Sequence, residues 1–93
     1  MSKEKPLTPV QEAVITAIYD ACHGSLSAHV PEHAILARFR RDLRGEARKA
    51  LEKLRPRGYY MRHPTGGEMT YNLTTIGKRI AEELLAREGV RIS

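Results

Sequence analysis

The residues best suited to chemistry in this sequence are basic, and they lie close together in the chain. Residues 38–62 hold ten Lys and Arg against three acids, a balance of +7, whereas the whole chain has a net charge of +5, so the remaining residues sum to −2. Grouped guanidinium and ammonium groups attract a polyphosphate backbone more often than any other partner. We therefore expect an acidic partner, with nucleic acid as the first class to consider.

Other chemistries have weaker support in the sequence. His29 and His33 are four residues apart, but Pro31 lies between them, and Cys22 is the single cysteine, so the spacing favours neither a zinc site nor an internal disulfide. The sequence contains no glycine-rich phosphate loop, no nucleophile elbow and no evident acid/base pair. We expect no metal, no cofactor and no enzymatic activity.

The composition is that of an ordinary soluble domain, with 93 residues of which 41% are hydrophobic and 29% charged. No apolar run reaches the roughly eighteen residues that a membrane span needs. Residues 1–8 are polar and lack the apolar core of a signal peptide. We expect a flexible arm at 1–7, a single domain over 8–93, no membrane partner and a cytoplasmic location.

Hydrophobic spacing predicts a first helix near the N-terminus. Thr8 can cap it, Pro9 suits its first position, and Gln11 completes a capping box. Gly24 is a natural stop. Leu26, in the polar segment that follows, could make a short strand contact.

Two further helices are predicted before the middle of the chain. Pro31 opens a short helix over 32–39, and Asp42 would cap a third helix that Pro56 stops. The inward residues expected on the second helix are Ala34, Ile35 and Phe39. The third helix would bury a stripe of Leu43, Ala47, Ala50, Leu51 and Leu54.

The hydrophobic period then changes from about 3.6 to 2. The runs 59–63 and 69–73 alternate around the turn residues 64–67, a pattern typical of a β-hairpin. Tyr59 and Tyr60 are adjacent and face opposite sides of a strand, so we expect one in the core and the other half-buried. Thr74 would cap a fourth helix over 74–88, with an inward face of Ile76, Ile80, Ala81, Leu84 and Leu85.

The second and third helices are joined by roughly three residues, as in a helix-turn-helix. The chain resembles the winged helix-turn-helix domains of small prokaryotic transcriptional regulators, including the multidrug-response and phenolic-acid-response types. The resemblance covers residues 8–88 and is most evident where Arg57-Gly58-Tyr59 enters the wing, and where Tyr71-Asn72-Leu73-Thr74 with Gly77 leads into the last helix. It implies a mainly α fold with a small β-hairpin, in the order helix-helix-helix-strand-strand-helix.

This resemblance also implies that the third helix enters the major groove of double-stranded DNA and brings its early residues to base edges. Arginine can donate two hydrogen bonds to guanine O6 and N7. The residues at those positions are Arg44, Gly45, Arg48 and Lys49.

Further contacts are expected around this helix. Arg38, Arg40 and Arg41 flank the turn and would lie near phosphates, where they fix register without reading sequence. Arg62 and His63 lie beside the hairpin tip and suit the minor groove or the backbone, although Glu68 adds an acid there.

Three questions stay open at this stage. Arg44 and Arg48 could be solvated charges paired with Glu46 or Glu52. The basic surface could serve a non-specific nucleic-acid binder associated with chromatin or RNA, or a winged-helix module that binds a protein. The C-terminal helix could support a homodimer through a contact surface of Ala81, Leu85, Val90 and Ile92, or those residues could cover the core of one subunit.

Overall fold

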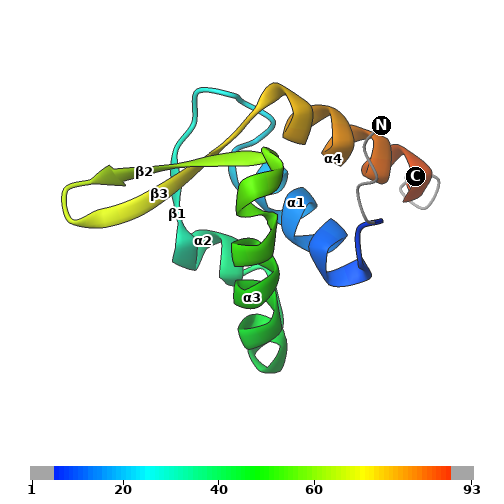
Figure 1. The fold of residues 1–93 in the computed structure, drawn as a ribbon, viewed down its shortest axis with the longest axis horizontal. Coiled ribbons are helices and arrows are strands. Elements are labelled where there is room, and N and C mark those ends of the chain that lie inside the picture. The colour runs from blue at the N-terminus through cyan, green and yellow to red at the C-terminus, as the bar shows by residue number, and fades with distance from the viewer. Residues whose placement is uncertain (1–5, 89–93) are drawn as a thin grey trace.

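The protein folds as a winged helix-turn-helix, in the predicted order of helices and strands (Figure 1). The computed structural model describes residues 6–88, so most of the expected arm, together with Val90 and Ile92, lies outside the described range. The regular elements are α1 (Pro9–Ala21), β1 (Val30–Pro31), α2 (Glu32–Leu36), α3 (Arg44–Leu54), β2 (Tyr60–Thr65), β3 (Glu68–Leu73) and α4 (Thr75–Glu88), with 3₁₀ turns at Arg41–Leu43 and Arg55–Arg57.

The start of α1 confirms the predicted capping box. The Thr8 hydroxyl oxygen accepts from the backbone N–H of Gln11 at 3.1 Å, and the Gln11 side chain accepts from the backbone N–H of Thr8 at 3.0 Å. From there α1 crosses the middle of the molecule, and its inward residues Val14, Ile15 and Ile18 are almost fully buried. The other helices pack around α1, which therefore forms the centre of the core.

The hairpin belongs to a three-stranded antiparallel sheet in the order β1-β3-β2. The short strand contact expected at Leu26 is instead made by Val30, which pairs with Tyr71, while Leu26 is exposed. A residue before proline is driven toward extended backbone, and Pro31 therefore prepares Val30 to pair. The strand contact fixes the start of α2 against the middle of β3.

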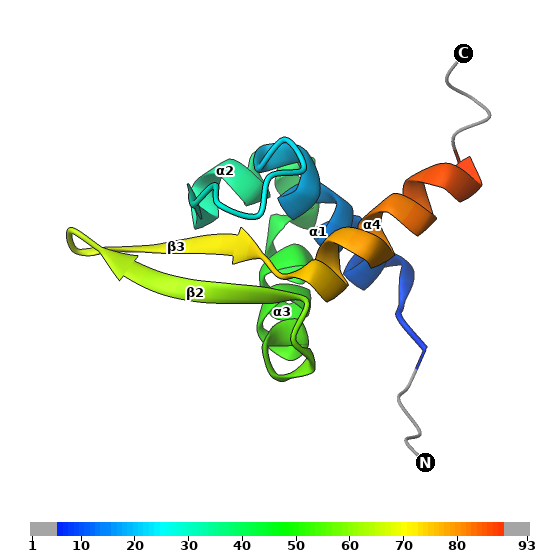
Figure 2. The ribbon, with the colours of Figure 1, turned by 90° about the horizontal axis from the view of Figure 1, so that it is seen from above.

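The wing projects away from the helices as a long ribbon (Figure 2). Its two-residue turn, Gly66-Gly67, has positive φ angles of 54° and 84°, which a hairpin turn of the primed type requires. Tyr59 and Tyr60 are both buried, contrary to the expectation for one of them. Tyr60 faces α3, and the Tyr59 backbone lies against α4. Helices therefore cover the chain on both sides at this point.

The stripe predicted for α3 is buried from Ala47 to Leu54, but its first member is not. Leu43 lies in the 3₁₀ turn and is 39% exposed, because the tighter rotation of that turn carries it off the buried face. Asp42 does not cap α3. It accepts instead from Arg40, at 3.2 Å.

The second helix is shorter than predicted, since α2 ends at Leu36 and Phe39 follows in a turn. In α4, Thr74 caps as expected and accepts from the backbone N–H of Gly77 at 3.1 Å. Ile76 and Leu85 are exposed rather than inward. They are nine residues apart, which at 3.6 residues per turn places them at opposite edges of the buried face.

None of the helices within residues 6–88 combines the length and apolarity required to traverse a bilayer.

Candidate nucleic-acid interface

The third helix divides its residues between three sides. One side is buried in the core through Ala47, Leu51 and their neighbours. The opposite side exposes Gly45 and Lys49, and a methyl group added at Gly45 would meet no atom within 4 Å. The edge of α3 that faces the wing carries Arg44 and Arg48, and Arg55, at the start of the 3₁₀ turn that follows, continues this row.

A hollow of about 660 Å³ lies between α2, the first turns of α3 and strand β3. Arg44 and Arg48 both line it, so the structure brings together two of the residues predicted to read bases. The acids Glu32 and Glu68 line the same hollow, along with His33, Leu36, Ala37 and Met69. This surface therefore combines two guanidinium groups with carboxylates that sequence reasoning did not place beside them.

Arg44 is tied to the turn between α2 and α3. Its Nε donates to the carbonyl oxygens of Leu36 and Phe39, both at 3.1 Å. Leu36 ends α2 and its carbonyl also accepts from the backbone N–H of Phe39, whereas the Phe39 carbonyl lies in the turn beyond the helix. Arg44 thus stabilises the turn as well as lining the hollow.

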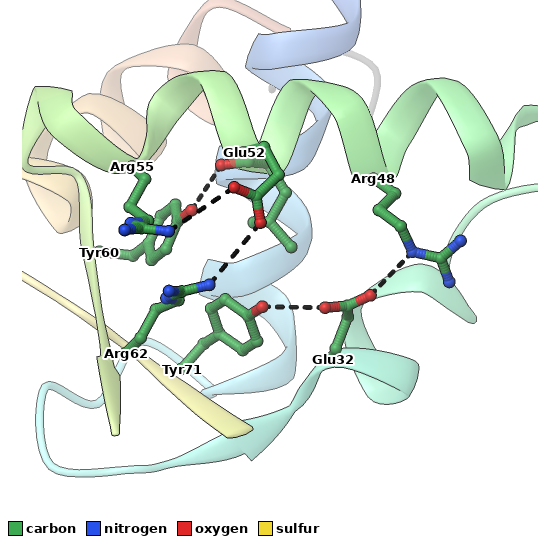
Figure 3. Close-up of polar contacts among 8 residues, drawn as sticks. Glu32, Arg48, Glu52, Arg55, Tyr60, Arg62 and Tyr71 are labelled. Carbon is green, nitrogen blue, oxygen red and sulfur yellow. Dashed lines mark hydrogen bonds and ion pairs between the residues drawn. The ribbon is translucent and has the colours of Figure 1, made fainter. Parts of the chain in front are cut away.

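Arg48 is held by a carboxylate from another helix. Its Nε donates to Glu32 at 2.9 Å, and the hydroxyl of Tyr71 donates to the other oxygen of Glu32 at 2.9 Å (Figure 3). Burial acts to raise the pKa of Glu32, but the hydrogen bonds from Arg48 and Tyr71 and nearby positive charge outweigh it, so this pKa lies below its ordinary value. The partner of Arg48 is therefore Glu32, and neither Glu46 nor Glu52.

Arg62 points toward α3 and away from the tip of the wing. In the strand register it lies opposite Tyr71, and its guanidinium is 3.6 Å from Glu52, which also pairs with Arg55 at 3.7 Å. Its side chain is only 27% exposed.

Burial together with the Glu32 hydrogen bond raises the pKa of Tyr71 to about 12, so this hydroxyl remains a donor near neutral pH.

Arg38 and Arg40 lie on a different side of the turn. Arg38 donates to Asp20 of α1 at 2.6 Å and to the Ala34 carbonyl oxygen at 2.7 Å. Both arginines line a second hollow, of about 610 Å³, next to α1 and Leu85. They are thus separated from the pair formed by Arg44 and Arg48.

The remaining predicted residues differ in their surroundings. Arg41 and Lys49 are exposed, and across residues 6–88 neither side chain has an ion-pair or hydrogen-bond partner. His63 is half-buried on the other face of the wing, with its ring 4.8 Å from that of His29. The turn residues 65–68 include Glu68 and no cation, so positive charge is concentrated at α3 and its preceding turn.

Within the described range, no group of three or more His, Cys, Asp or Glu side chains is arranged to hold a metal ion. Sequence reasoning missed Glu32 and Tyr71 as parts of this surface. Glu32 is 16 residues from Arg48 and 39 from Tyr71, so no local spacing could have indicated the contact.

Comparison with known proteins supports the fold. No protein-family profile matches the sequence, and no curated protein does. Among solved structures, TubR of type III plasmid segregation is similar over 94% of this chain and 94% of its own, with a TM-score of 0.52 and 13% sequence identity. At that identity the similarity concerns the fold.

Proposed function

We propose that this protein binds double-stranded DNA in a sequence-specific manner, with α3 in the major groove, and that it acts as a transcriptional regulator. The observation that carries the proposal is the pair of arginines on one edge of α3, which line a hollow beside the wing, with Lys49 on the adjoining exposed side. Arginine is the side chain that most often reads guanine, and a helix of this size fits the major groove. Arg41, exposed just before α3, would contact phosphate.

The test is DNA binding by charge-matched variants. Arg48→Ala with Lys49→Ala should weaken binding to duplex DNA strongly, whereas Arg79→Ala with Arg87→Ala, which removes the same charge from α4, should change it little. Fluorescence anisotropy with a labelled duplex measures both. Equal losses in the two double variants would contradict a binding surface on α3. Competition between an enriched site and bulk DNA then tests specificity, since specific sites win by about a thousandfold or more.

A second candidate is a module that binds a protein through the same fold. It is favoured by the acidic partners of several of these arginines, because Arg38, Arg48 and Arg62 all pair with carboxylates of the same chain. A module of this kind would not bind random duplex DNA even at low salt. A non-specific nucleic-acid binder would bind every duplex with similar affinity.

We further propose that two copies associate through α4, because a two-fold symmetric site lets each subunit read a few base pairs. Ala81 is fully buried, and the contact would therefore use Leu85, which adjoins Leu43 across the second hollow. Sedimentation of the protein should show a dimer that Leu85→Glu dissociates. A monomer at all concentrations would contradict this arrangement.

A further inference from the structure

We propose that Glu32 is a positioning residue, which aims the guanidinium of Arg48 at a guanine base, and that Tyr71 holds Glu32 in place. The inference rests on the proposed function, because it takes α3 to lie in the major groove. It adds a specific role for two residues outside α3 that would not touch the DNA themselves.

The geometry of Arg48 leaves its two terminal nitrogens available. Only Nε is engaged, at 2.9 Å from Glu32, and the side chain remains 60% exposed. Within residues 6–88 the terminal nitrogens have no partner, and Figure 3 shows them beyond the Nε that Glu32 binds. Two parallel N–H donors from one guanidinium are what guanine O6 and N7 accept.

The carboxylate that orients Arg48 is itself fixed from the core. Tyr71 is 1% exposed, its ring packs 5.4 Å from the ring of Tyr60, and its hydroxyl reaches Glu32. Three elements, β3, α2 and α3, therefore meet in one chain of contacts that ends at the guanidinium. A side chain held in this way loses less conformational freedom when it binds.

Lys49 and Arg38 lack this combination, whereas Arg44 also has an anchored Nε but is held by backbone carbonyl oxygens and not by a carboxylate. Lys49 is exposed with no partner among the described residues, and it could offer only a point charge. Arg38 uses both Nε and one terminal nitrogen within the chain, so its fork is already occupied. Of Arg38, Arg48 and Lys49, only Arg48 has its Nε bound within the chain while both terminal nitrogens are available for a base.

Glu32 could instead act as a mask, neutralising Arg48 and repelling phosphate. The two roles differ in what they change. A positioning residue affects the choice of base at one position, whereas a mask affects affinity for every duplex alike.

The experiment begins with selection of bound duplexes by the wild-type protein at physiological salt, followed by dissociation constants for each base at each position of the enriched site. At one position we expect a preference for guanine that falls roughly 10- to 100-fold in Arg48→Ala and Arg48→Lys. Glu32→Ala should lose most of that same preference, and Glu32→Gln, which keeps an acceptor oxygen without the charge, should lose part of it. Tyr71→Phe removes only the hydroxyl and should give a smaller loss at the same position.

A double-mutant cycle separates direct from indirect action. If Glu32 acts through Arg48, then Glu32→Ala has no further effect on base preference in a protein that already carries Arg48→Ala. Thermal melting verifies that each variant is folded, and Tyr71→Phe with Glu32→Gln carry the test should Glu32→Ala not fold.

Two results would overturn the proposal while leaving DNA binding intact. One is a uniform gain in affinity for all duplexes in Glu32→Gln with the guanine preference unchanged, which is the behaviour of a mask. The other is an undiminished effect of Glu32→Ala in the absence of the Arg48 side chain. A wild-type protein that binds no duplex at all would overturn the proposed function, and this inference with it.

Discussion

Arginines one turn apart on α3 are held by different kinds of acceptor, and this difference separates their roles. Arg44 donates to two backbone carbonyls at the end of α2, whereas Arg48 donates to a carboxylate. From the sequence alone, we expected both at DNA base edges, with solvated surface charges as the alternative. The hydrogen bonds of Arg44 indicate that it also stabilises the turn between the two helices.

Replacing Arg44 should therefore cost stability as well as DNA affinity. Arg44→Ala removes the side-chain donor from the carbonyls of Leu36 and Phe39, of which only Leu36 keeps a backbone donor, the N–H of Phe39. We expect the free energy of unfolding to fall by about 1–2 kcal/mol. Lys49→Ala, which removes an exposed charge with no partner among residues 6–88, is the matched control and should change it little. Urea titration measures both, and equal stability of the two variants would argue against a structural role for Arg44.

The carboxylate of Glu32 predicts a dependence of stability on acid. Because the pKa of Glu32 is lower in the folded protein than its ordinary value of 4.5, the ionised form favours folding. That contribution is fully present above pH 4.5 and is lost as the pH falls through the lower folded pKa. Wild type should thus be more stable than Glu32→Gln at pH 7, and the difference should shrink as the pH is lowered below 4.5.

Urea titrations of both proteins across this range give the measurement. Glu83→Gln, at an exposed carboxylate of α4 with no partner among the described residues, is the control and should differ little from wild type at either pH. A stability difference between wild type and Glu32→Gln that persists unchanged into strong acid would show that charge is not the cause.

At the scale of elements, the passage from the wing into α4 depends on close approach of two backbones. Thr74 donates its hydroxyl to the Gly58 carbonyl oxygen at 2.6 Å and accepts from the Gly77 N–H. A Cβ at Gly77 would lie 1.9 Å from the carbonyl oxygen of Tyr59. The absence of a side chain at this position therefore lets α4 pack against the start of the wing.

Two glycine substitutions in helices should act in opposite directions. Gly77→Ala forces α4 away from Tyr59 and should lower the free energy of unfolding by about 3 kcal/mol. Gly45→Ala, where the added methyl group meets open space, should raise it by about 0.5–1 kcal/mol. Thermal or urea unfolding compares them directly, and a destabilised Gly45→Ala would mean that α3 is not helical there in solution.

The same pair of variants bears on function. If the backbone at Gly45 approaches DNA closely, Gly45→Ala will weaken binding although it stabilises the fold. Binding that stays at the wild-type level would remove Gly45 from the proposed interface while leaving the arginines in it.

The elements that sequence predicted well depend on local physics. The capping box of Thr8 and Gln11, the buried stripe of α3 after its first residue, and the glycine turn of the wing each follow from residues within a few positions of one another. The 3₁₀ turn that exposes Leu43 is also local, but its tighter winding leaves no clear mark on hydrophobic spacing. The hydrophobic spacing around Leu43 predicted a helix, but it did not show at which residue the buried face of α3 begins.

The parts of the candidate site that sequence did not predict depend on tertiary contacts. Arg38 and Arg44 are close in the chain, yet the turn directs one toward α1 and the other toward the wing. The carboxylate of Glu32 reaches Arg48 only because β1 fixes the start of α2 beside β3. Which side of the turn each arginine faces is decided by how the helices pack. The spacing of residues in the sequence does not contain that information.

For the whole molecule, pairing within the chain reduces the positive charge that the sequence suggests. Several arginines between 38 and 62 have carboxylate partners, namely Arg38, Arg40, Arg48, Arg55 and Arg62. The exposed cations in this segment with no acidic partner among the described residues are Arg41, Lys49 and Lys53. Arg41 lies in the turn before α3 and Lys49 in its middle, whereas Lys53 lies in its last turn. In Figure 1, α4 lies far from the start of α3. The net field should therefore be strongest where we propose that DNA binds.

This distribution predicts how affinity for DNA responds to salt. The logarithm of the binding constant should fall linearly with the logarithm of salt concentration, with a slope set by the number of phosphates that cations neutralise. Arg41→Ala and Lys49→Ala should each make that slope shallower by about 1 if each residue contacts a phosphate. Arg87, near the end of α4, pairs with Glu12 of α1. Arg87→Ala therefore removes one charge without a phosphate contact and should leave the slope unchanged. A parallel decrease in all three variants would mean that DNA responds only to the net charge of the protein and not to cations placed along α3.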